Sequence, residues 1–233
     1  MKSIIITGAS HGIGAAIARR FAKENYQLAI CARNAKELEL FSKELLLLGA
    51  STVYSMPVDV SDKIAAKSFA YYALEQLKNV SILVNNAGSF EPGTIADEEE
   101  GQLEKMLQTN LLSAYNITRV LLPHFKQKKQ GHIVNICSVA SLKAYPNGGS
   151  YSISKYALLG FSDNLREELK HDQIKVSAIC PGATNSRSWS GANVPKERLM
   201  PAEDIAETVW TLCQLSNSTV LENVILRPQF GDL

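Results

Sequence analysis

Short apolar runs alternate along the chain with longer segments in which apolar residues recur every three or four positions. The short runs lack the polar alternation of strands that face water on one side, so they predict strands buried on both faces. These runs lie at Ser3–Thr7, Gln27–Cys31, Thr52–Met56, Ile82–Asn85, His132–Cys137, Lys175–Ile179 and Asn223–Leu226.

The segments between these runs predict helices, because their apolar residues fall on one helical face, as do Ile13, Ile17 and Phe21. The predicted helices span Ile13–Glu24, Lys36–Leu48, Ile64–Leu77, Glu100–Lys126, Tyr151–Lys170 and Ala202–Leu215. Repeated strand–helix–strand units predict an α/β fold, a Rossmann-type doubly wound parallel sheet of about seven strands with helices on both faces. No linker or repeat interrupts this order, so we expect residues 1–233 to form one domain.

The composition is that of an ordinary globular protein, with 45% hydrophobic and 20% charged residues. The formal net charge is +1, which does not favour nucleic acid or an anionic membrane as a partner. No apolar run approaches the ~20 residues of a membrane span. The four cysteines lie far apart and the four histidines have no metal-ligand spacing, so we expect reduced thiols, a cytoplasmic location and no metal site.

The first predicted strand leads directly into the turn Thr7-Gly8-Ala9-Ser10-His11-Gly12-Ile13-Gly14 and then into a helix. Glycines permit a tight turn and a close approach of backbone amides to a pyrophosphate, which the helix N-terminus also attracts. The motif therefore predicts a dinucleotide site, although a glycine-rich turn that only packs a helix on a sheet is the alternative. His11 either contacts the cofactor or faces solvent.

The second predicted strand ends in Ile30-Cys31-Ala32-Arg33-Asn34. Ala32 stands where an acidic residue would hold the 2′-hydroxyl of NAD, and the Arg33 guanidinium that follows suits the 2′-phosphate of NADP. This arrangement favours NADP(H) over NAD(H), with a solvated loop arginine as the alternative interpretation.

Ser138, Tyr151 and Lys155 form a candidate catalytic set. Tyr151 and Lys155 are four residues apart on a predicted helix and share one face. We expect the lysine ammonium, together with an oxidised nicotinamide, to lower the Tyr151 pKa from its ordinary value near 10 toward a range useful for acid–base catalysis. Ser138 is expected to donate a hydrogen bond to the substrate oxygen. A buried hydroxyl pair beside a lysine is the non-catalytic alternative.

Taken together, these motifs closely resemble the short-chain dehydrogenase/reductase family. The resemblance covers residues 3–184 in family order and rests on Thr7-Gly8-xxx-Gly12-x-Gly14, Asp59, Asn85-Asn86-Ala87-Gly88, Asn110, Ser138, Tyr151-xxx-Lys155 and Pro181-Gly182. The Ser-x12-Tyr-x3-Lys spacing makes it specific.

The resemblance implies cofactor contacts at each end of a nicotinamide dinucleotide. The implied contacts are Gly8, Ser10, Gly12, Ile13 and Gly14 for the pyrophosphate, Asp59 and Val60 for the adenine, Asn86, Ala87 and Gly88 along the cofactor, Lys155 for the nicotinamide ribose, and Pro181, Gly182 and Thr184 for the nicotinamide.

The resemblance also implies a mechanism, in which Tyr151 protonates the alkoxide formed by hydride transfer to a small carbonyl substrate. Ser138 polarises the carbonyl, and Asn110 anchors a water that links Lys155 to solvent. The implied assembly is a homodimer or homotetramer that uses the helices at Glu100–Lys126 and Tyr151–Lys170.

Ligands of parallel α/β sheets bind beyond the carboxyl ends of the strands, where we expect the segments Ser89–Ile95, Val139–Ser150 and Thr184–Leu199. The last is a candidate substrate loop, at about residues 184–199, or an ordinary surface loop. The candidate apolar wall is Phe90, Tyr145, Pro146 and Trp189, and the candidate anion contacts are Lys143 and Arg187.

Two further segments affect the interpretation. The acidic run Asp97-Glu98-Glu99-Glu100 is expected to face the positive end of the helix that follows it. The carboxyl-terminal segment Asn223–Leu233 has a single glycine where many family members have a Gly-Gly pair, which argues against a role in fatty-acid synthesis.

Two alternatives to a reductase remain. One is a regulator that senses NADP(H) without turnover, although such proteins tend to lose the tyrosine or lysine that this chain keeps. The other is a sugar-nucleotide epimerase or dehydratase, which usually needs a longer carboxyl-terminal domain than 233 residues allow.

Overall fold

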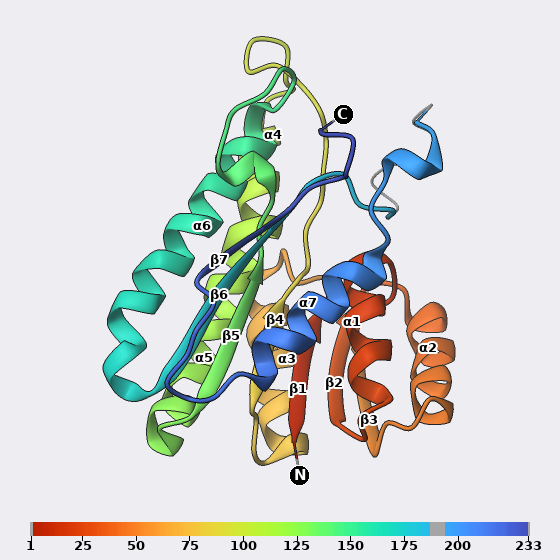
Figure 1. Ribbon diagram of the computed structural model, residues 1–233, viewed down its shortest axis with the longest axis vertical. Helices are drawn as coiled ribbons and strands as arrows, with labels where there is room; N and C mark the ends of the chain where they lie inside the picture. Colours follow the sequence, from red (N-terminus) through yellow and green to blue (C-terminus); the bar gives the residue numbers. More distant parts are fainter. Residues whose placement is uncertain (1, 187–193, 233) are drawn as a thin grey trace.

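The computed structural model describes residues 2–186 and 194–232 and shows one parallel sheet between two layers of helices (Figure 1). The strands are β1 (Ser3–Thr7), β2 (Gln27–Ala32), β3 (Thr52–Pro57), β4 (Ile82–Asn85), β5 (Gly131–Ile136), β6 (Ile174–Pro181) and β7 (Asn223–Leu226). The helices are α1 (Gly12–Ala22), α2 (Ala35–Leu47), α3 (Lys63–Leu77), α4 (Gln102–Leu107), α5 (Ser113–Lys128), α6 (Gly149–Leu169) and α7 (Ala202–Gln214), with short turns at η1 (Gln108–Leu112), η2 (Val139–Ser141), η3 (Lys170–Asp172) and η5 (Lys196–Arg198).

The sheet has seven strands in the order β3-β2-β1-β4-β5-β6-β7, and every neighbouring pair is parallel. This confirms the doubly wound α/β prediction. The direction of winding reverses between β1 and β4, and such a reversal opens a crevice at the carboxyl ends of the strands. The fold therefore places the ends of β1, β4 and β5 around one potential binding site.

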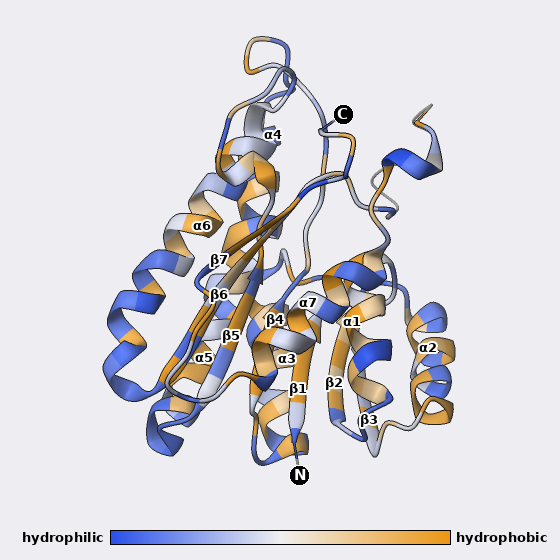
Figure 2. Cartoon of the chain, in the orientation of Figure 1, coloured by the Kyte–Doolittle hydropathy of each residue, from blue (hydrophilic) through white to orange (hydrophobic). Residues whose placement is uncertain are grey.

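Both faces of the sheet are covered, as the continuous apolar strands predict. One core joins the sheet to α1, α2 and α7 and contains Phe21 and Ile205. The second core joins the sheet to α3, α5 and α6 and contains Phe69 and Phe125. The side chains of Phe21, Ile205, Phe69 and Phe125 are fully buried. Figure 2 shows the central strands as hydrophobic and the outer surfaces of the helices as largely hydrophilic. Within the described residues, no helix is both long enough and apolar enough to cross a membrane.

The long helix predicted over Glu100–Lys126 differs from the structure in one respect. The chain forms α4, then a π-helical turn at Gln108–Leu112, and then α5. Gly101, whose φ is +85°, precedes α4 and separates this helix from the acidic run Asp97–Glu100. The extra residue of the π-helical turn rotates α5 relative to α4, which simple periodicity does not reveal.

Candidate active site

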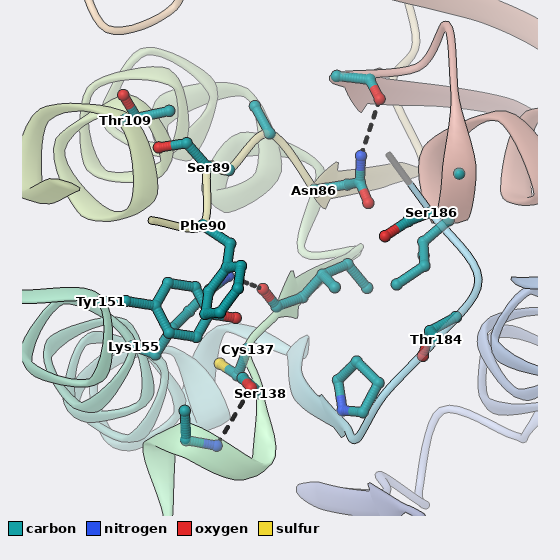
Figure 3. A pocket seen from close by; sticks show the side chains of 18 of the residues that line it. Asn86, Ser89, Phe90, Thr109, Cys137, Ser138, Tyr151, Lys155, Thr184 and Ser186 are labelled. Atoms are coloured by element: carbon teal, nitrogen blue, oxygen red, sulfur yellow. Dashed lines mark hydrogen bonds between the residues drawn. The ribbon is translucent and has the colours of Figure 1, made fainter. Parts of the chain in front are cut away.

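A cleft runs along the carboxyl ends of the strands from β3 to β7. It is lined by every cofactor and catalytic residue predicted from the sequence, except Gly14 and Asn110. The cleft thus joins positions that lie more than a hundred residues apart in the chain. Figure 3 shows Phe90 against Tyr151, with Thr184 and Ser186 on the opposite side.

The glycine turn between β1 and α1 forms one end of the cleft. Gly8 and Gly12 have φ values of +63° and +53°, a left-handed conformation that glycine adopts without strain. Helix α1 begins at Gly12, and its N-cap residue His11 makes no side-chain capping hydrogen bond. The first amides of α1 are therefore free of a side-chain cap, as a pyrophosphate site requires.

Gly14 lies behind this turn, where it allows close packing. A Cβ atom there would stand 2.4 Å from both Asn86 Nδ2 and the Gly8 carbonyl oxygen. Asn86 Nδ2 donates hydrogen bonds to the carbonyl oxygens of Thr7, at 2.8 Å, and Gly8, at 2.9 Å. The Thr7 hydroxyl oxygen accepts from the backbone N–H groups of Asn86 and Ala87, each at 3.0 Å. These contacts fix the turn against the end of β4.

Polar and charged groups line the end of the cleft beside β2 and β3, where the sequence analysis predicts the adenosine contacts. Arg33 is exposed just after β2, and Asp59 and Val60 lie nearby in the lining. Burial alone would raise the Asp59 pKa, but hydrogen bonds from the Ser61 N–H (3.0 Å) and hydroxyl (2.8 Å), and the Arg33 charge, hold that pKa below its ordinary value. Asp59 is therefore ionised at neutral pH.

His11 lies at the rim of the cleft between two polar neighbours. Its Nδ1 is 2.8 Å from the Ser10 hydroxyl oxygen, and its Nε2 is 3.5 Å from a carboxylate oxygen of Glu37 on α2. The ring is half-buried, so the structure places it in contact with the cleft and not fully in solvent.

The catalytic candidates converge at the other end of the cleft. Ser138 follows β5, and its hydroxyl hydrogen-bonds Tyr151 in the first turn of α6. The Phe90 ring packs edge-on against the Tyr151 ring, with centroids 4.8 Å apart. Lys155 Nζ donates to the Ile136 carbonyl oxygen at 2.9 Å and lies 6.0 Å from the centre of the Tyr151 ring. The predicted trio is thus assembled from β5 and α6.

The electrostatics of this trio differ from the sequence-based expectation. Burial raises the Tyr151 pKa, and the Ser138 hydrogen bond opposes this only in part. Burial lowers the Lys155 pKa. For the chain by itself, burial of both groups therefore outweighs the expected lowering of the Tyr151 pKa by Lys155. The expected effect of an oxidised nicotinamide stays a prediction.

Asn110 lies outside the cleft, in the π-helical turn, and is 1% exposed. Its Oδ1 accepts from the Ser89 N–H at 2.8 Å, and its Nδ2 donates to the Ser89 carbonyl at 3.0 Å and to the Ser154 hydroxyl at 2.8 Å. A Cβ atom on Gly88 would be 3.1 Å from Asn110 Oδ1 and 3.6 Å from Lys155 Nζ. Asn110 therefore lies near the lysine, and the implied water relay stays a prediction.

The segment after β6 closes the end of the cleft where the resemblance implies nicotinamide contacts. Pro181, Gly182 and Thr184 line it, and Thr184 forms an isolated bridge with Met200. Of the candidate substrate side chains, those that line the cleft are Phe90, Lys143, Tyr145 and Pro146. The other two candidates, Arg187 and Trp189, lie outside the described residues.

The carboxyl-terminal segment also lines the cleft, which the sequence interpretation missed. Gly182 N–H donates to the Leu226 carbonyl at 2.8 Å, and the Arg227 side chain hydrogen-bonds Asp232. Arg227 and Asp232 both belong to the lining. The unusual carboxyl-terminal sequence was the available signal, but only the pairing of β7 with β6 brings it to the site.

Comparison with known proteins gives a consistent family. Residues 2–196 match the model of the family described as short chain dehydrogenase. The chain is 32% identical over 242 residues to a sepiapterin reductase of Chlorobaculum tepidum, covering 100% of this chain and 99% of that protein. It is 33% identical over 181 residues to the ketoacyl reductase HetN of Nostoc, covering 78% of this chain and 63% of that protein.

Solved structures agree with the sequence relatives. An alcohol dehydrogenase from the archaeon Thermococcus sibiricus, complexed with 5-hydroxy-NADP, has a TM-score of 0.93 and 30% identity, covering 100% of this chain and 99% of that one. A 7α-hydroxysteroid dehydrogenase complexed with NADH and 7-oxo glycochenodeoxycholic acid has a TM-score of 0.90 and 26% identity, covering 99% and 94%.

Proposed function

The chain belongs to the short-chain dehydrogenase/reductase family, and from this premise we propose that it is an NADP(H)-preferring carbonyl reductase in which Tyr151 is the acid–base catalyst. Members of the family are oxidoreductases that act on C=O and CH–OH groups of small molecules with a nicotinamide cofactor. The finer proposal rests mainly on one observation, the convergence of Ser138, Tyr151 and Lys155 at one end of a cleft whose other end is the glycine turn.

The cleft fits a nicotinamide dinucleotide. The left-handed glycines of the turn and the uncapped start of α1 suit a pyrophosphate. When bound, the cofactor supplies the hydride, and the protein supplies placement and electrostatics. We assign cofactor contacts to the predicted residues that line the cleft, and to Gly14 the role of keeping the turn close to Asn86.

The proposed chemistry uses three side chains in distinct roles. The Tyr151 phenol, which stays protonated at neutral pH because burial raises its pKa, donates its proton to the substrate oxygen as the carbonyl is reduced. The Ser138 hydroxyl orients that oxygen and stabilises its developing charge. Lys155 binds the cofactor ribose and takes part in returning the proton through the water that Asn110 is proposed to anchor.

Preference for NADP(H) is carried by the end of β2. Ala32 offers no carboxylate to a ribose hydroxyl, and the exposed Arg33 is available for a 2′-phosphate. Two of the solved relatives are complexes with 5-hydroxy-NADP and with NADP, which supports the assignment. The solved 7α-hydroxysteroid dehydrogenase is a complex with NADH, so the preference of this chain for NADPH over NADH needs a direct comparison of the two cofactors.

We also propose a cytoplasmic homodimer or homotetramer formed by one domain per chain. Leu112 beside α5, Tyr115 on α5, and Ile153 and Tyr156 on α6 are 39–44% exposed. Large apolar side chains gathered on neighbouring helices are suited to burial between subunits. The oligomeric state in solution, measured by light scattering, tests this part.

The test of the function is cofactor oxidation by the purified protein, measured with NADPH and NADH in parallel. The carbonyl panel contains a pteridine ketone, a 3-oxoacyl thioester, a steroid ketone, a diketone, a quinone, an aromatic aldehyde and a keto-sugar. Turnover of at least one class with preference for NADPH is expected. Stabilisation by NADPH without turnover of any class would instead support a sensor of the cofactor.

A further inference from the structure

The acidic run Asp97-Glu98-Glu99-Glu100 precedes α4, but not all of its side chains are directed to that helix. One of its members, Glu98, points to a different helix and contacts the first turn of α6. Glu98 Oε1 accepts a hydrogen bond from the Ser150 backbone N–H at 2.8 Å, and Oε2 accepts from the Ser150 hydroxyl. The two residues are 52 positions apart in the chain, so this is a tertiary contact.

Helix α6 lacks a cap of its own. Its N-cap residue is Gly148, which has no side chain to accept from the free amides of the first turn. Glu98 supplies that acceptor from outside the helix, and a carboxylate is favourable beside the positive end of the helix dipole. Ser150, which donates both hydrogen bonds to the Glu98 carboxylate, is 2% exposed and directly precedes Tyr151.

The carboxylate fits closely between two glycines. A Cβ atom on Gly149 would lie 2.1 Å from Glu98 Oε1, and a Cβ atom on Gly93 would lie 2.9 Å from Glu98 Cγ. The Gly93 N–H also donates to the Asn147 carbonyl oxygen at 3.0 Å. The segment before Glu98 and the segment before α6 are therefore joined at two places.

The same segment also holds the tyrosine ring. Phe90, eight residues before Glu98, packs edge-on against Tyr151, as Figure 3 shows. One stretch of chain thus contacts Tyr151 by its ring and, through Ser150, by its backbone.

We propose that Glu98 is a positioning residue for carbonyl reduction, which holds the first turn of α6 and so places the Tyr151 phenol for proton transfer. The inference rests on the proposed function of Tyr151. Its effect belongs in kcat and not in cofactor binding, because Glu98 holds only the first turn of α6, whereas Lys155 lies in the next turn and has its own hydrogen bond to the Ile136 carbonyl oxygen. A displacement of a catalytic group by about 1 Å can cost on the order of a hundredfold in rate.

The test compares Glu98→Ala with Glu98→Gln and with the control Glu99→Ala, whose side chain is exposed in the same run. Glutamine keeps an oxygen for the Ser150 N–H and an amide group for the Ser150 hydroxyl. We expect Glu98→Ala to lower kcat about tenfold to a hundredfold, with the KM for the carbonyl and the Kd for NADPH within about twofold of wild type. Glu98→Gln is expected to recover most of the lost rate, and the control to match wild type.

A Glu98→Ala enzyme with wild-type kcat would overturn the proposal, as would a Glu98→Gln enzyme as impaired as the alanine variant. If Glu98→Ala does not fold, Ser150→Ala carries the test, since it removes only the hydroxyl contact. A smaller fall in kcat at constant KM supports the proposal, because the Ser150 backbone N–H still donates to Glu98, and an unchanged kcat contradicts it.

Amide hydrogen exchange separates this inference from the proposed function. If the wild-type protein reduces no carbonyl, the proposed function fails, and the Ser150 and Tyr151 amides still report on the anchor. Faster exchange at these amides in Glu98→Ala than in Glu99→Ala supports the anchor. Equal exchange in the two variants refutes it.

Discussion

The buried His132 gives a quantitative prediction of how the free energy of unfolding depends on pH. It lies on β5, is 4% exposed, and its Nε2 is 2.9 Å from the Ser177 hydroxyl oxygen on β6. Within the described part of the chain, its Nδ1 has no hydrogen-bond partner. Burial, with a smaller contribution from the Lys175 charge, lowers the His132 pKa to about 3. The folded protein therefore holds this imidazole neutral.

The pH dependence of stability that results has a definite sign. Between the folded pKa of about 3 and the unfolded value of about 6.5, the unfolded chain binds a proton at His132 that the folded chain does not. The contribution of His132 to stability is thus complete above about pH 6.5 and is lost as the pH falls through that value. From about pH 8 to about pH 5 the loss is about 2 kcal/mol, a sizeable part of a total of roughly 5–15 kcal/mol.

The assay is urea denaturation of wild type and of His132→Gln at several pH values. Glutamine retains a hydrogen-bonding group for Ser177 but cannot be protonated in this range. The wild-type free energy of unfolding should fall by about 2 kcal/mol more than that of the variant between those two pH values. His171→Gln, at an exposed position, controls for the substitution. Parallel pH profiles for wild type and His132→Gln would show that the folded protein does not hold this imidazole neutral.

Three further predictions concern the cofactor and the catalytic tyrosine. Arg33→Ser should raise the Kd for NADPH about tenfold to a hundredfold, as expected for a lost hydrogen bond to a charged group, and leave the Kd for NADH within about twofold of wild type. Both Kd values are measured by titration of the intrinsic fluorescence, and equal changes for the two cofactors would contradict the prediction. Burial raises the Tyr151 pKa above its ordinary value of 10, so kcat/KM for reduction should stay level from about pH 6 to about pH 9. Over the same range kcat/KM for alcohol oxidation, which needs the tyrosinate, should rise. A reduction profile that falls within this range would contradict the assignment. Gly14→Ala should lower the free energy of unfolding by about 1–3 kcal/mol and weaken NADPH binding, because its Cβ would stand 2.4 Å from Asn86 Nδ2 and the Gly8 carbonyl oxygen; wild-type values of the melting temperature and of the Kd would argue against that packing.

The sheet was predictable because each strand is apolar throughout, a pattern that signals burial on both faces without knowledge of the neighbours. Three predicted strands, Ser3–Thr7, Ile82–Asn85 and Asn223–Leu226, have the bounds seen in the structure, and the other four differ by one or two residues at one or both ends. Strand ends are set by hydrogen bonds to a neighbour, which a local pattern does not contain.

The parts that were not predictable depend on contacts between distant segments. The π-helical turn around Asn110 is stabilised by Ser89 and Ser154, which a helical pattern does not include. Glu98 belongs to an acidic run that suits any nearby helix N-terminus, and only the fold shows that it reaches α6. The raised pKa of Tyr151 follows from burial, which a one-turn spacing from Lys155 does not reveal.

The proposed function depends above all on proton transfer by Tyr151 during an NADPH-dependent carbonyl reduction. The decisive experiment is NADPH oxidation by wild type and by Tyr151→Phe with the best carbonyl of the panel, together with the Kd of each protein for NADPH. Phenylalanine keeps the ring that packs against Phe90 and removes only the hydroxyl. We predict a Kd within about twofold of wild type and a kcat lower by at least about a hundredfold. A Tyr151→Phe enzyme that binds NADPH normally and retains most of its turnover would contradict the acid–base role of Tyr151.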